Sequence, residues 1–238
     1  TVHGLVFRKR SGSVLAVLWS WACHPVMHYD RTQVSADFPG RVRDRLRRVH
    51  NDDTLTVLYY QGFSGDLKPN LLDVSWLKRS LVAQMNRLVH GPRSIASTSE
   101  SFGKWNECLA DAVEDAVFGD GAEELEPSIA AGRASIPLTD ILDGPVPDDV
   151  FTVHAVELGE GIVLTGMSAE VVTYYTDVVR GAFDGKTVVP VGCVDGTYGY
   201  LPTDNMVREG GYEARRFFGF FGLVGCSFKP DLERKIED

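Results

Sequence analysis

The apolar run "SVLAVLWSWAC", residues 13–23, constrains the fold of this chain more than any other stretch. It is nearly continuous in apolar residues, a pattern typical of strands that are covered on both faces. Such strands occur mainly in proteins in which helices pack against a sheet. The run therefore predicts a buried strand inside a layered α/β domain.

The segments after this strand alternate between helical and extended patterns. Residues 35–50 predict a helix that Asp37 can cap near its start, with one apolar face formed by Val42, Leu46 and Val49. Residues 54–61 predict a second buried strand. Residues 75–91 predict a second helix that ends at a glycine and has one apolar stripe, Leu77, Leu81, Met85 and Leu88.

The second half of the chain predicts further strands and one more helix. Residues 147–158 and 161–166 are expected to pair across a tight Gly-Glu-Gly turn. A helix over 168–183 should direct Val171, Tyr175, Val178 and Val179 inward, and a final strand is expected over 186–193. The middle segment, about 92–150, predicts a helix near 107–118 and then acidic, Gly/Pro-rich connections.

These patterns indicate an α/β fold with a mixed sheet covered by helices. No repeat and no linker divides the sequence, so residues 1–238 are interpreted as a single domain. The formal net charge of −9 excludes a general nucleic-acid role, because phosphate binding needs a basic face. No apolar run is long enough to span a membrane.

The four cysteines, Cys23, Cys108, Cys193 and Cys226, are far apart and lack the spacing of a metal site. We expect buried free thiols, with a Cys193–Cys226 bridge as the alternative. This pattern does not require an oxidising compartment, which leaves the location open with the cytoplasm favoured.

Four polar loops follow predicted strands, and such loops meet at one edge of an open α/β sheet, where ligands bind. Their sequences are "CHPVMH", "GFSGDLKPN", "GMSAE" and "DGTYGYLPTDN". The side chains that they offer are His24, His28, Asp66, Lys68, Asn70, Glu170, Tyr198 and Tyr200. Histidine, carboxylate and other oxygen ligands from separate loops can hold a zinc ion. The alternative is that these are structural residues, with Glu170 favouring a helix N-terminus.

The same loops occur in order in a known family. The segments "FRKRSGSVLAVLWSWACHPVMH", "SADFPG", "GDLKPN", "GMSAE" and "GYLPTDNMVREGGYE" resemble the neutral (non-lysosomal) ceramidases and their bacterial relatives. This resemblance covers most of the chain. It implies a ceramidase-like catalytic domain, represented by its C-terminal portion. It also implies a zinc amidase that cleaves an N-acyl bond in a small-molecule amide.

The resemblance assigns site residues position by position. His24 matches a histidine ligand, Glu170 a carboxylate ligand and Tyr200 a tyrosine ligand of one zinc ion, with Tyr198 as the alternative to Tyr200. Tyr212 matches a second active-site tyrosine that can polarise the substrate carbonyl.

The loop at residues 61–70 departs from the family at one position. Lys68 stands where the family motif has a catalytic serine, and a lysine can act as a base or as an electrophile towards a carbonyl. We expect Asp66 and Asn70 to bind neighbouring backbone groups and to line the substrate site, while Gly65 permits a sharp turn. The alternative is a rigid structural turn with Lys68 in solvent.

The family also takes a further histidine ligand from a segment upstream of the first buried strand, which these 238 residues do not contain. We therefore expect a companion N-terminal chain of the same precursor. Thr1 suggests another mechanism, in which self-cleavage exposes a threonine nucleophile whose own amine acts as base, without metal. A third hypothesis is a non-catalytic binding protein that kept the fold.

Overall fold

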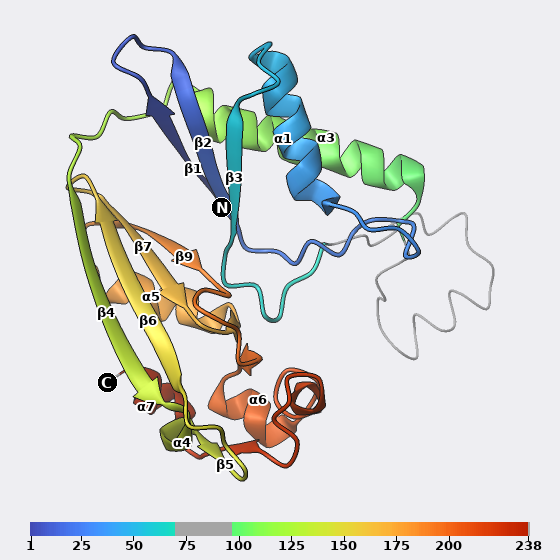
Figure 1. Cartoon of the computed structure of the whole chain (residues 1–238), viewed down its shortest axis with the longest axis vertical. Helices are drawn as coiled ribbons and strands as arrows, with labels where there is room; N and C mark the ends of the chain where they lie inside the picture. Colours follow the sequence, from blue (N-terminus) through green and yellow to red (C-terminus); the bar gives the residue numbers. More distant parts are fainter. Residues whose placement is uncertain (70–96, 238) are drawn as a thin grey trace.

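The computed structural model describes residues 1–69 and 97–237. These residues form two main sheets, seen at the top and bottom of Figure 1, with helices packed beside them, and two further sheets of only two strands each. The helix expected over 75–91, together with Asn70, lies outside the described residues. None of the described helices is long and apolar enough to cross a membrane.

The first sheet contains β1 (Val2–Arg8), β2 (Val14–Trp21) and β3 (Thr56–Gln61), in the order β1-β2-β3. β1 and β2 are antiparallel, whereas β2 and β3 are parallel. Two helices, α1 (Asp37–Val49) and α3 (Ser99–Phe118), lie against this sheet (Figure 1). The sheet is therefore mixed and helix-covered, as the sequence predicts.

β2 is buried on both faces only over part of its length. Its centre, from Val17 to Ser20, is buried, but Leu15 is 53% exposed. Val17 and Trp19 pack against α1 and α3, while Leu18 faces a cavity of about 60 Å³ that is also lined by Leu164 of the second sheet. The second sheet thus supplies part of the cover on the face of β2 away from the helices.

The prediction that residues 54–61 form a fully buried strand is wrong. β3 alternates between exposed and half-buried positions, with Leu58 48% and Tyr60 40% exposed. Val57 and Tyr59 face the helices, so Leu58 and Tyr60 point to the opposite face. β3 is the end strand of the sheet that the described residues form, and its outer face is covered only in part, where Tyr60 lines the cavity shared with the second sheet.

α1 has the predicted inward residues Val42 and Leu46, both fully buried, whereas Val49 is 46% exposed. Ala36 occupies the N-cap position, and its side chain makes no cap. Asp37 lies in the first turn with a left-handed φ of 48°, and its carboxylate accepts a hydrogen bond from the backbone N–H of Phe38 at 2.7 Å. Aspartate tolerates this conformation better than most residues.

The second sheet contains β4 (Ile129–Pro137), β6 (Val150–Leu158), β7 (Ile162–Met167) and β9 (Thr187–Val191), in the order β4-β6-β7-β9. The predicted hairpin is confirmed, since β6 and β7 are antiparallel neighbours. β9 runs parallel to β7, and α5 (Tyr174–Gly181) contacts β9.

The other described elements are short. They are α4 (Leu138–Ile141), β5 (Leu142–Asp143), β8 (Glu170–Val171), β10 (Tyr200–Leu201), α6 (Asp204–Glu209), η2 (Arg216–Gly219), β11 (Ser227–Phe228) and α7 (Leu232–Glu237).

Two further predictions need correction. The helix expected over 168–183 begins only at Tyr174, because Glu170 and Val171 form β8 by pairing with β10. Val171 is buried, but in this strand rather than on a helix. β4 was not predicted at all, and most of its residues are exposed. All four cysteines are free, as expected, but the expectation that they are buried is correct only for Cys23 and Cys226, since Cys108 and Cys193 are exposed.

Each sheet has its own hydrophobic core, and the loop after β3 connects the two. One core contains Val17, Trp19 and the inner faces of α1 and α3. The other contains residues of β7, α5 and the C-terminal segment, but also Phe63, which follows β3 and is fully buried there. Phe63 therefore anchors the end of the first sheet in the core of the second.

Candidate functional site

The four polar loops meet, although they leave strands of two sheets rather than one. The end of β3 and the loop that follows it bond to segments from both sheets. The N–H of Gly65 donates to Val171 O at 2.7 Å, and the N–H of Gly192 donates to Gln61 O at 2.9 Å. The N–H of His24 donates to Leu67 O at 3.3 Å. The carboxyl ends of β2, β3, β7 and β9 are thereby joined at one place.

The junction needs a glycine at residue 65. The reason is a close approach between two backbone segments, not the sharp turn expected from the sequence. A Cβ atom at residue 65 would lie 2.6 Å from Glu170 O and 3.1 Å from Val171 O. Both contacts involve backbone, which cannot move aside cheaply. Glycine therefore allows the loop after β3 to approach the segment that carries Glu170.

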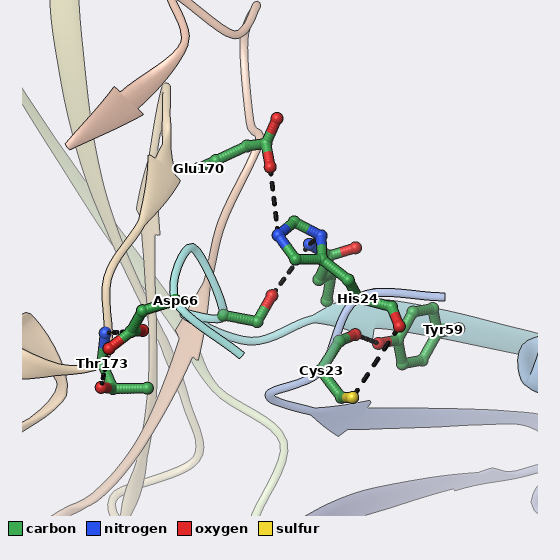
Figure 2. Close-up of polar contacts among 8 residues, drawn as sticks. Cys23, His24, Tyr59, Asp66, Glu170 and Thr173 are labelled. Carbon is green, nitrogen blue, oxygen red and sulfur yellow. Dashed lines mark hydrogen bonds and ion pairs between the residues drawn. The ribbon is translucent and has the colours of Figure 1, made fainter. Parts of the chain in front are cut away.

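His24 and Glu170 face each other across the junction. The Nε2 atom of His24 lies 3.2 Å from Oε2 of Glu170, and the two side chains are 20% and 18% exposed. Figure 2 shows the carboxylate directed at the imidazole ring. This Nε2 atom is buried, and it has no well-aligned hydrogen-bond partner within the described part of the chain. The pair is thus close without forming a satisfied hydrogen bond.

Tyr200 joins this pair through strand pairing. β10 runs parallel to β8 with Tyr200 opposite Glu170, and the N–H of Glu170 donates to Gly199 O at 2.7 Å. Burial raises the pKa of the Tyr200 hydroxyl, and the neighbouring Glu170 carboxylate raises that pKa further. The Tyr200 hydroxyl therefore keeps its proton at neutral pH and lies beside the carboxylate.

The two other tyrosines named from the sequence have different positions. The ring of Tyr212 lies 5.5 Å from the ring of Tyr200 in an edge-to-face arrangement, and Tyr212 is 43% exposed. The hydroxyl of Tyr198 instead donates to the carboxylate of Asp149 in the turn before β6. Of the two candidate tyrosine ligands, Tyr200 is thus the one placed beside Glu170.

The two charged residues of the loop after β3, Asp66 and Lys68, have different surroundings. The carboxylate of Asp66 accepts hydrogen bonds from the N–H and the hydroxyl of Thr173, both at 2.8 Å (Figure 2). Asp66 thus joins this loop to the start of α5. Lys68 is exposed.

Two further residues named from the sequence are Thr1 and His28. Thr1 is exposed and precedes Val2, which pairs with Trp21, so it lies at the end of the sheet from which the His24 loop departs. The Nδ1 atom of His28 lies 2.9 Å from Asp30 O within the same loop, and its ring stacks on Tyr29.

Three residues that sequence reasoning did not select also belong to this junction. Nε2 of Gln61 lies 3.2 Å from Nδ1 of His24 and donates to Ser64 Oγ at 2.9 Å. Cys193 has a left-handed φ of 59°, and its N–H donates to Ala169 O. Although the residue is exposed at the surface, partial burial of its sulfur raises the pKa of the Cys193 thiol, and the Glu170 carboxylate raises it as well. Only the position of Gln61 at the end of a strand pointed to a site.

The donor set of His24, Glu170 and Tyr200 suits a zinc ion. Zinc binds histidine nitrogen and carboxylate oxygen at about 2.0–2.2 Å, so two such ligands in a tetrahedral site are about 3.3–3.6 Å apart. The His24–Glu170 separation of 3.2 Å lies just below the short end of that range. A group of three His, Cys, Asp or Glu side chains suited to a metal does not occur within residues 1–69 and 97–237.

Comparisons with solved structures show a ceramidase-like fold. The chain is similar to the crystal structure of neutral ceramidase from Pseudomonas aeruginosa, with a TM-score of 0.67 and 14% identity. It is also similar to a structure described as ceramidase complexed with C2, with a TM-score of 0.68 and 12% identity. Each match covers 98% of this chain but only 44% and 46%, respectively, of the solved chain. No protein-family model and no curated protein matches the sequence.

Proposed function

We propose that this chain is the catalytic part of a hydrolase that cleaves a linear amide bond, with a small N-acyl amide as its substrate. The observation that carries this proposal is the approach of His24 to Glu170 beside Tyr200, on loops from both sheets of a ceramidase-like fold. Residues that converge from separate loops on a partly buried point are typical of a catalytic site.

His24, Glu170 and Tyr200 would hold one zinc ion through Nε2, the carboxylate and the phenolic oxygen. By the family resemblance, a fourth ligand would be a histidine from polypeptide outside the 238 residues. Zinc in such a site supplies Lewis acidity, which polarises a carbonyl group and makes water more acidic. Nε2 of His24 supports this role, because it has no hydrogen-bond partner among the described residues, and a buried nitrogen without a partner is costly unless something binds it.

The protein residues around this point would divide the remaining work. Tyr212 is exposed beside Tyr200, so its hydroxyl can donate a hydrogen bond to the substrate carbonyl oxygen as negative charge develops there. Lys68, in the loop after β3, would accept a proton from the reacting groups or donate one to them. Asp66, whose carboxylate binds Thr173, would keep that loop in position at the edge of the substrate site.

A threonine nucleophile at Thr1 is the second candidate mechanism. The pairing of Val2 with Trp21 favours it, because this pairing brings Thr1 to the end of the sheet where His24 lies. In this mechanism the Thr1 hydroxyl attacks the amide carbonyl and the Thr1 amine accepts the hydroxyl proton. The amine then passes this proton to the leaving nitrogen as the C–N bond breaks, and water hydrolyses the resulting threonine ester to release the acid. Blocking the amine by acetylation abolishes this activity, whereas a zinc chelator leaves it unchanged.

Further polypeptide is also proposed to complete the molecule. Leu58 and Tyr60 expose apolar surface on the face of the first sheet away from α1 and α3. The two solved ceramidase structures are each more than twice as long as the part that this chain matches. A companion chain of the same precursor is expected to cover this face. A 238-residue chain that sediments as a monodisperse monomer and unfolds cooperatively would contradict this expectation.

The main proposal is tested by measuring hydrolysis of a series of N-acyl amides after removal and return of zinc. We expect activity to disappear with chelation and to return with zinc. Activity that survives exhaustive chelation and is abolished by acetylation of the Thr1 amine would favour the threonine mechanism. Tight ligand binding without turnover would favour a binding protein.

A further inference from the structure

The amide of Gln61 lies between His24 and Ser64. Its nitrogen lies 3.2 Å from His24 Nδ1 and 2.9 Å from Ser64 Oγ. Gln61 is the last residue of β3, it pairs with Trp21 of β2, and its carbonyl oxygen accepts a hydrogen bond from Gly192. The backbone of Gln61 is therefore held by β2 on one side and by Gly192 on the other. This limits the positions that its side-chain amide can take beside the imidazole ring.

The two nitrogens of His24 have different surroundings. Nε2 faces Glu170 and lacks an aligned partner among the described residues, whereas Nδ1 faces the Gln61 amide. A neutral imidazole carries its proton on one nitrogen only. If Nε2 is to bind a metal through its lone pair, the proton must be on Nδ1, and Nδ1–H then needs a hydrogen-bond acceptor.

Gln61 can provide that acceptor without leaving its place. A half-turn of the amide about its last side-chain bond exchanges Oε1 and Nε2, which have nearly the same size. Oε1 would then accept a hydrogen bond from Nδ1–H of His24. Ser64 would remain bonded, because its hydroxyl can donate to Oε1 as well as accept from Nε2. All three groups therefore keep a partner in both amide orientations.

We infer that Gln61 is a positioning residue that selects the tautomer of His24. With its carbonyl towards His24, Gln61 holds the proton on Nδ1 and leaves the Nε2 lone pair free beside Glu170. With its amide N–H towards His24, Gln61 favours the proton on Nε2, where it opposes metal binding. This inference rests on the proposed function, because it gives His24 Nε2 the role of a zinc ligand.

Two substitutions at residue 61 separate this role from simple packing. Gln61→Glu replaces the amide with a carboxylate that can only accept, so it should hold the Nδ1–H tautomer permanently. Gln61→Met keeps the length of the side chain and removes the acceptor. Loss of a partner that orients a metal-binding histidine typically reduces metal affinity by about 10- to 100-fold.

The experiment measures zinc affinity by competition with a chromophoric chelator, and the His24 tautomer by ¹⁵N chemical shifts of the imidazole in metal-free protein. Folding of each variant is checked by circular dichroism. We expect Gln61→Met to weaken zinc binding by about 10- to 100-fold. Gln61→Glu should bind zinc at least as tightly as the parent and show predominantly the Nδ1–H tautomer without metal.

The outcomes distinguish this inference from the proposed function. If the parent binds zinc but Gln61→Met binds it equally well, the positioning role is wrong and the zinc site stands. If the parent binds no zinc, the proposed zinc site fails, and the metal-free tautomers alone decide the role of Gln61. Identical His24 ¹⁵N shifts in the parent, Gln61→Glu and Gln61→Met would then overturn it. If Gln61→Met does not fold, Gln61→Glu decides the role of Gln61, and the inference is overturned if that variant does not show predominantly the Nδ1–H tautomer without metal.

Discussion

His24 Nε2 lies 3.2 Å from a carboxylate oxygen of Glu170, although the two residues belong to segments that follow different sheets. Neither sheet alone would bring them together. The contact depends on the loop after β3, which inserts Phe63 into the second core and bonds to Val171 through Gly65. The geometry of the candidate site is therefore a direct consequence of how the two halves are joined.

The first prediction compares two tyrosines. Tyr200→Phe should weaken zinc binding and reduce amide hydrolysis, because it removes the oxygen beside Glu170. Tyr198→Phe is the matched control, since it removes a hydroxyl bonded to Asp149 instead. We expect the control to bind zinc like the parent and to lose little folding stability, because its bond to Asp149 is exposed to solvent. Equal zinc affinities in the two variants, measured by chelator competition, would argue against Tyr200 as a ligand.

The second prediction concerns Lys68. If its amine takes part in proton transfer, Lys68→Met should fold normally and lose about 10²- to 10⁴-fold in turnover. Lys68→Ser, which introduces the family residue, should recover part of this loss under the zinc mechanism. Lys9→Met, at an exposed position before the β2 strand, serves as the control. Unchanged hydrolysis by Lys68→Met would identify this lysine as a solvated residue of the turn.

The third prediction concerns the bond between Asp66 and Thr173. Asp66→Ala removes two hydrogen bonds that join the loop after β3 to α5, so it should reduce both stability and turnover. Because Asp66 is exposed, water replaces part of what these bonds contribute, so the loss of stability should be small. Asp52→Ala is a close control, because Asp52 accepts the same pair of bonds from nearby Thr54. The deciding measurement is turnover. Asp52→Ala should retain the turnover of the parent, whereas Asp66→Ala should lose it.

The fourth prediction concerns alkaline pH. Burial raises the pKa values of Tyr59, Tyr175 and Tyr200 above the ordinary value of about 10. These tyrosines stay protonated in the folded protein while they ionise in the unfolded chain. Their contribution to stability is therefore complete below about pH 10 and is lost as the pH rises towards the folded pKa values.

Urea unfolding at several pH values between about 8 and 12 measures this effect. Tyr59→Phe should flatten the alkaline loss of stability, although it also removes hydrogen bonds from the Tyr59 hydroxyl to the Trp21 and Cys23 carbonyls near His24. Figure 2 shows this tyrosine beside the strand end. A parent and a Tyr59→Phe variant with the same pH dependence would show that Tyr59 does not contribute to it.

Much of the fold was predictable because apolar periodicity is strong where elements are buried. β2, α1 and the β6–β7 hairpin follow this rule. β4 could not be predicted in the same way, since its sequence "IAAGRASIP" is exposed at most positions and has no apolar alternation. β8 was mistaken for the start of a helix because only its pairing with β10, which is distant in sequence, makes it a strand.

The candidate site was accessible from sequence through its strand-end loops and their resemblance to a family. His24, Glu170 and Tyr200 were selected in this way, and the structure brings them together. Gln61 was not selected, because a glutamine at the end of a strand has no distinctive pattern. Its significance appears only from its distance to His24 Nδ1, which depends on the parallel pairing of β2 and β3.

The zinc content and affinity of the parent and of Glu170→Gln test the central claim most directly. The control is His28→Ala, since His28 lies in the loop of His24 but interacts with Asp30 and Tyr29. We predict one zinc ion per chain in the parent and in His28→Ala. In Glu170→Gln we predict an affinity at least about 100-fold lower, beyond the loss expected for a residue that only supports a ligand. A parent that binds no zinc, or a Glu170→Gln variant that binds it as tightly as the parent, would contradict the account.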